Sequence, residues 1–118
     1  MMRPSPKTLS RLGAASAVLA LGFLATAVAS IGPDIEIAQR AIRFSQSSLT
    51  ISAGELVHYH NFDDVTHNLM VIGSDDVPQD QGLQRPGATV SYRFTASGTF
   101  EVRCAIHPKM KMTVTVRE

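Results

Sequence analysis

A segment near the end of the chain, CAIHPKMKM from Cys104 to Met112, gathers side chains that bind soft metal ions. It holds the only cysteine of the 118 residues, and Cys104, His107 and Met110 follow one another at intervals of three residues. A loop with this spacing presents a thiolate, an imidazole and a thioether to one small ion. The segment therefore predicts a metal site.

The donor types narrow the choice of metal. Thiolate and imidazole together favour copper, and two histidines, one cysteine and a weak axial methionine form the blue-copper arrangement. This set requires a second histidine. His67 is the candidate because it begins a predicted strand after the loop at 63–66, and a sandwich brings distant strand ends together. The adjacent Asn68 is expected to hold the ligand loop through hydrogen bonds around the metal.

Two other chemistries use a thiol beside an imidazole. A Cys/His hydrolase needs an activated nucleophile and an oxyanion hole, and the sequence contains no motif for either. A closed zinc site accepts cysteine and histidine, but methionine is a poor zinc ligand. We therefore expect a copper-binding protein and not an enzyme.

The elements that must position these residues are short strands. From residue 31 onward, segments of alternating apolar and polar residues are separated by turn residues, without helical periodicity, which predicts an all-β sandwich or barrel. The expected strands cover 35–38, 41–44, 48–52, 55–61, 67–72, 89–95, 99–104 and 111–118, and a long polar loop is expected at 73–87.

The strand predicted at 55–61 carries two further histidines. Alternation places Tyr59 and its neighbours at i±2 on one face, and His58 and His60 on the other. The simpler interpretation is that His58 and His60 face solvent. The alternative is a second, weaker metal-binding surface.

The first 29 residues differ from the rest of the chain. Three basic residues precede an uncharged run at 12–29, which ends in the small-x-small pattern AVA. This pattern predicts a secretory signal peptide at 1–29, cleaved near Ala29, and a periplasmic domain at 30–118 without a membrane span. A retained membrane anchor is the alternative, because the run reaches the lower limit for a span.

Charge and cysteine content fit an exported domain. The chain has 11 basic and 10 acidic residues, and removal of the three basic leader residues leaves 8 against 10, a net charge of −2. This balance excludes the strongly basic surface of a nucleic-acid-binding protein. A single cysteine forms no internal disulfide, and a free thiol in an oxidising compartment indicates a function or burial.

The ligand segment resembles that of the cupredoxins, the blue copper proteins, and especially their amicyanin and plastocyanin branch. Cys-x-x-His-Pro-x-Met is amicyanin-like. The similarity extends through the predicted domain and is carried by Gly54, Val57, Tyr59, Asn61, His67, Asn68, Pro86, Gly87, Phe94, Gly98, Thr99, Phe100 and Cys104.

This resemblance implies a Greek-key β-sandwich of seven or eight strands with one type 1 copper ion. It implies His67, Cys104 and His107 as equatorial ligands and Met110 as the axial ligand. Plastocyanin-like loops place the methionine five residues after the histidine, which would select Met112. The alternating valines that follow fit the shorter loop, so Met110 is preferred and Met112 is the alternative.

The resemblance also implies a function. A monomer would carry single electrons between redox partner proteins, such as a periplasmic dehydrogenase and a cytochrome c or oxidase, with His107 as the exit toward a partner. The alternative is a periplasmic protein that stores or delivers copper without redox turnover. Met112, His58 and His60, as additional metal-binding side chains, keep this alternative open.

Overall fold

The computed structural model describes residues 32–118, together with 2, 13, 17–20, 22 and 24. The predicted signal peptide otherwise lies outside the described residues. The chain divides into two compact units, Met1–Ser30 and Ile31–Glu118. Among the described residues, none belongs to a helix of the length and apolar character that a membrane crossing requires.

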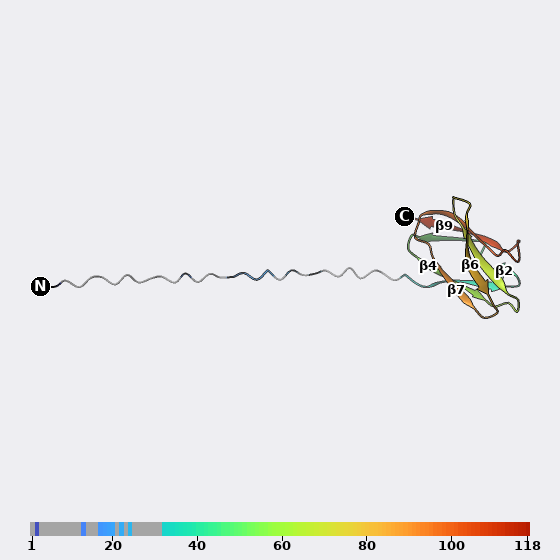
Figure 1. The fold of residues 1–118 in the computed structure, drawn as a ribbon, viewed down its shortest axis with the longest axis horizontal. Helices are drawn as coiled ribbons and strands as arrows, with labels where there is room; N and C mark the ends of the chain where they lie inside the picture. Colours follow the sequence, from blue (N-terminus) through green and yellow to red (C-terminus); the bar gives the residue numbers. More distant parts are fainter. Residues whose placement is uncertain (1, 3–12, 14–16, 21, 23, 25–31) are drawn as a thin grey trace. The chain divides into compact units, whose positions relative to one another are not determined.

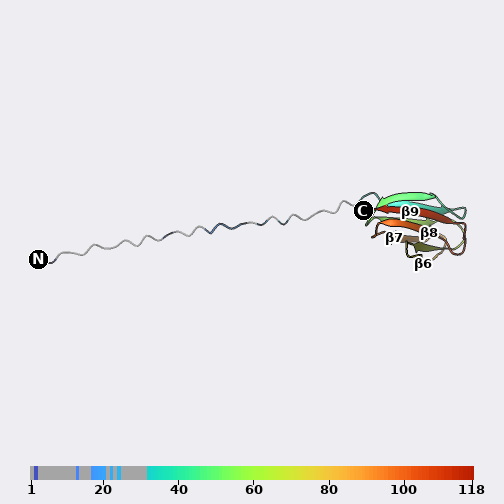
Figure 2. The ribbon, with the colours of Figure 1, turned by 90° about the horizontal axis from the view of Figure 1, so that it is seen from above.

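The second unit is built from two sheets (Figure 1). One has the order β2-β1-β4-β7 and the other the order β3-β9-β8-β5-β6. The strands lie in layers when this unit is seen from above (Figure 2). They are β1 (Ile35–Arg40), β2 (Arg43–Phe44), β3 (Ser48–Ser52), β4 (Leu56–Asn61), β5 (His67–Ile72), β6 (Pro78–Gln84), β7 (Thr89–Arg93), β8 (Gly98–Arg103) and β9 (Lys111–Arg117). The predicted all-β class is confirmed, with nine strands in the described part of the chain.

One apolar core takes side chains from both sheets, because alternate residues of each strand point inward. In β9 every second residue from Met112 to Val116 is buried, and in β4 Tyr59 and its neighbours at i±2 are buried. His58 and His60 occupy the other face of β4, as predicted. The buried core residues are Ile37, Phe44, Ile51, Val57, Tyr59, Leu69, Val71, Phe94, Val102, Cys104, Met110, Met112, Val114 and Val116.

The segment at 73–87, predicted as a loop, contains strand β6, so this prediction was wrong. β6 pairs antiparallel with β5, and the register shifts between Asn68 and Met70. Only Gln84 of its seven residues is buried. The strand lies at the edge of its sheet and contributes little to the core, so its sequence lacks the apolar alternation that identifies other strands.

Only the second half of the strand predicted at 41–44 is a strand, and its first two residues form a turn. Ala41 and Ile42 have φ angles of 51° and 57°, a left-handed conformation that costs energy for residues with a side chain. Their amides donate hydrogen bonds of 2.6 and 3.0 Å to the two carboxylate oxygens of Asp63. These bonds compensate for the strained backbone and fix Asp63 close to the strand end that carries His67.

Candidate metal centre

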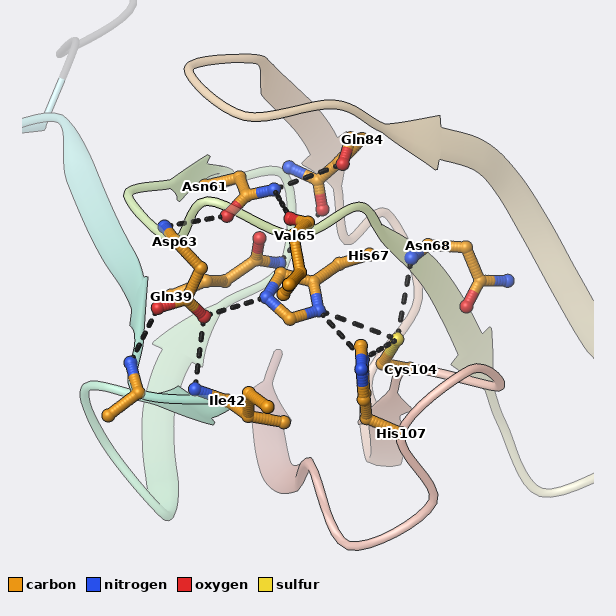
Figure 3. A network of polar contacts seen from close by, with 11 residues as sticks. Gln39, Ile42, Asn61, Asp63, Val65, His67, Asn68, Gln84, Cys104 and His107 are labelled. Carbon is orange, nitrogen blue, oxygen red and sulfur yellow. Dashed lines mark hydrogen bonds and ion pairs between the residues drawn. The ribbon is translucent and has the colours of Figure 1, made fainter.

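Three predicted ligands meet at one end of the sandwich (Figure 3). His67 begins β5, Cys104 follows β8, and His107 lies in the loop between β8 and β9. The two histidine Nδ1 atoms are 3.1 Å apart, and the Cys104 Sγ lies 3.9 Å from that of His67 and 3.7 Å from that of His107. Within the described residues, this is the one group of three such side chains with ligand atoms within 4.8 Å.

These separations fit a single ion. Metal–nitrogen bonds of about 2.05 Å and a metal–sulfur bond of about 2.3 Å in one plane put the nitrogens about 3.5 Å apart, and each nitrogen about 3.8 Å from the sulfur. The observed distances are close to these values. His67 and Cys104 are fully buried, whereas His107 is partly exposed. Two imidazoles and a cysteine sulfur in a mostly buried site suit copper.

The loop that carries Cys104 and His107 is closed by its own backbone. The Cys104 amide donates a 3.0 Å hydrogen bond to the carbonyl of Met110, and the Met110 amide donates a 2.9 Å bond to the carbonyl of His107. Met110 therefore lies across from Cys104, just beyond the last β8–β9 pair. Met112 pairs with Val102, deeper in the sheet. Both methionines are buried.

Asn68 connects the two ligand-bearing segments, as the sequence predicted. Its amide donates to the Cys104 sulfur at 3.4 Å, and its side-chain oxygen accepts a 2.6 Å bond from the amide of Ala105. Figure 3 shows the bond to sulfur. The first bond orients the sulfur, and the second bond fixes the loop.

Sequence reasoning missed the role of Asp63. The Nε2 of His67 lies 2.8 Å from the Asp63 carboxylate, which leaves Nδ1 facing Cys104 and His107. Burial raises the pKa of Asp63, but hydrogen bonds from His67 and from the Ile42 and Ala41 amides lower it by more, so the pKa falls below its ordinary value. The signal in the sequence was an acidic residue four positions before a predicted ligand histidine, because metal-binding histidines are commonly oriented by carboxylates.

A buried amide network holds the loop before His67. The Asn61 side chain donates to the carbonyls of Val65 and Gln84 at 2.9 and 3.0 Å, and its oxygen accepts a 2.9 Å bond from the Asp63 amide. Gln84 also lies opposite His67 in the β5–β6 pair. The position of His67 therefore depends on residues from several strands.

The sequence matches the profile of the copper binding proteins of the plastocyanin/azurin family over residues 33–117. The chain belongs to this family. This cupredoxin is 31% identical to amicyanin-alpha of Methylorubrum extorquens, in a match covering 86% of the chain and 87% of the relative. It is 29% identical to the chloroplastic plastocyanin of Chlamydomonas reinhardtii, over 85% of the chain and 72% of the relative.

The cupredoxin fold is also that of a solved structure. A reduced tryptophan-to-tyrosine mutant of amicyanin superimposes with a TM-score of 0.66, at 22% identity, over 77% of this chain and 87% of that one. The family resemblance, the fold class and copper as the cofactor are thus confirmed. The relatives support a blue copper electron carrier, and His67, Cys104 and His107 form a possible type 1 site.

Proposed function

We propose that this cupredoxin transfers single electrons between redox partner proteins through one type 1 copper ion bound by His67, Cys104, His107 and Met110. The observation that carries the proposal is the convergence of two Nδ1 atoms and one Sγ at separations of 3.1–3.9 Å. When bound, copper supplies the one-electron redox change. The protein supplies a donor set whose positions change little between the two oxidation states.

Each ligand has a distinct part in this proposal. The Cys104 thiolate, held by the Asn68 amide, provides covalency and a route into the protein. Asp63 fixes the ring of His67, and the partly exposed His107 provides the route to a partner. The exposed Ile106, beside His107, adds apolar contact area around that exit.

In this proposal the protein works in the periplasm. This location is supported by the signal-peptide pattern at 1–29, with cleavage near Ala29. The mature monomer would exchange electrons with a dehydrogenase on one side and a cytochrome c or oxidase on the other. The buried Cys104 thiol suits an oxidising compartment, because a fully buried sulfur is shielded from oxidants.

The direct test adds one equivalent of copper(II) to residues 30–118 and records visible and EPR spectra, with the zinc(II)-loaded protein as a colourless control. We expect an intense blue colour, a narrow copper hyperfine splitting and reversible one-electron reduction. A pale product, or reduction to bound copper(I) without any blue form, would contradict electron transfer and favour copper storage or delivery.

The axial ligand is tested by a matched pair of variants. Met110→Leu should change the visible spectrum and raise the reduction potential, because the axial thioether adjusts that potential. Met112→Leu should change neither. Both methionines are buried, and a methionine-to-leucine exchange costs less than about 1.5 kcal/mol, so both variants should fold. A spectral change confined to the Met112 variant would reverse the assignment.

A further inference from the structure

A second cluster of metal-binding side chains lies on the outer face of the four-stranded sheet. His58 and His60 are two residues apart on β4, and Glu36 of β1 pairs directly with His58 in the parallel register. Asp34 immediately precedes β1. These four residues, with Phe62 and Thr89, line a surface hollow of about 450 Å³. The proposed electron-transfer function uses none of these side chains.

Each of the two histidines is held through a hydrogen bond between its Nδ1 atom and a hydroxyl group. The His58 Nδ1 lies 2.6 Å from the hydroxyl of Ser91, and the His60 Nδ1 is hydrogen-bonded to the hydroxyl of Thr89. Both hydroxyls belong to the register partners on β7. When Nδ1 donates its proton to such a partner, Nε2 carries the free lone pair, as in histidines that bind metals.

One of the Nε2 atoms, that of His58, faces an acidic group across the hollow. The His58 Nε2 lies 3.9 Å from an Asp34 carboxylate oxygen, too far for a strong hydrogen bond. The His60 ring packs on Phe62 with centroids 4.1 Å apart, which limits its rotation. Residues two apart on a strand are spaced by about 6.6 Å, a distance that two imidazoles can close on one ion.

We propose that His58 and His60, with a carboxylate of Asp34 or Glu36, bind a second divalent transition-metal ion, with copper(II) preferred over zinc(II). Imidazole and carboxylate donors accept both ions, and copper(II) leads the affinity order of divalent metals. The only described group with three ligand atoms within 4.8 Å is the one at Cys104, so the side chains of the second site must move closer together to bind an ion. Its affinity is therefore lower than that of the thiolate site.

The test adds a second equivalent of copper(II) to the copper-loaded protein. We expect a second EPR signal with the wide hyperfine splitting of nitrogen and oxygen ligands, and no added blue absorption. The double variant His58→Asn/His60→Asn should bind this second ion at least about 10-fold more weakly, since even outer partners of metal ligands contribute that much. Its spectrum after the first equivalent should be unchanged.

The controls separate this site from other copper-binding positions. Glu101→Gln, which removes a carboxylate from the other sheet, should leave the second ion in place. Asp34→Asn/Glu36→Gln changes only exposed side chains, so it tests the site even if the histidine variant fails to fold. This carboxylate variant should also bind the second ion more weakly. Equilibrium dialysis counts the bound ions independently of colour, so the result holds even if the first site is not blue.

Two results would overturn the proposal. One is the absence of a second bound ion in the unchanged protein. The other is a second ion that is retained equally by the histidine and carboxylate variants, which would place it elsewhere on the chain.

Discussion

Replacing Cys104 by alanine abolishes the intense visible absorption expected of the copper-loaded protein. The absorption of a type 1 site arises from charge transfer between the thiolate and copper, and Cys104 is the only cysteine of the chain. The affinity for copper(II) should fall by more than about 100-fold. Loss of a residue that only orients a metal ligand already lowers the affinity by up to about that factor, and loss of the ligand itself should cost more. Absorption spectra and copper titrations of both proteins measure the two effects.

This variant also separates the two functional hypotheses. Electron transfer requires Cys104, whereas storage or delivery of copper(I) would retain much of its binding through His67, His107 and Met110. Cys104→Ser, which nearly preserves side-chain volume, controls for packing at this fully buried position. If a Cys104 variant kept the full absorption band, Cys104 would not be part of the copper site.

Replacing Asn61 by leucine lowers the free energy of unfolding of the metal-free protein by about 3 kcal/mol. The substitution keeps the branched shape and the number of side-chain heavy atoms but removes three hydrogen bonds, to Val65, Gln84 and the Asp63 amide. Each buried polar group left without a partner costs about 1–3 kcal/mol, although groups near the surface recover part of this from water. Denaturant unfolding measures the loss.

A neighbouring position provides the matched control. Asp64 lies on the same loop, but its side chain is exposed, so Asp64→Asn should change the free energy of unfolding by less than about 0.5 kcal/mol. Asn61→Leu should also weaken copper binding, because the loop it holds positions Asp63 and His67. Unchanged stability and copper affinity would show that the network around Asn61 does not hold the loop.

The cluster of His67, Cys104 and His107 could be predicted from sequence because each residue is marked by its local surroundings in the chain. Cys104, His107 and Met110 share one loop, and His67 begins a strand whose apolar residues identify it. Alternation likewise identified β4 and β9, since both pack one face against the core. Each of these features depends on residues that are close to one another in the chain.

The features that escaped prediction depend on partners distant in sequence or on position within a sheet. Asp63 contacts His67 with its carboxylate held by the amides of Ala41 and Ile42, which lie more than 20 residues earlier in the chain. Gln84 is buried because β6 pairs with β5. No local pattern marks Gln84 as buried, and the four-residue spacing of Asp63 and His67 does not by itself bring the two side chains together.

The polar character that concealed β6 has a further consequence for the protein at high concentration. An unpaired sheet edge offers its amides and carbonyls to any strand of another molecule. In β6, Pro78 lacks an amide hydrogen, and the charged Asp80 accepts a 2.8 Å hydrogen bond from the amide of Gly82. The edge therefore lacks two of its possible amide donors and carries the Asp80 carboxylate, which discourages one molecule from extending the sheet of the next. Protection against aggregation is built into the strand that contributes least to the core.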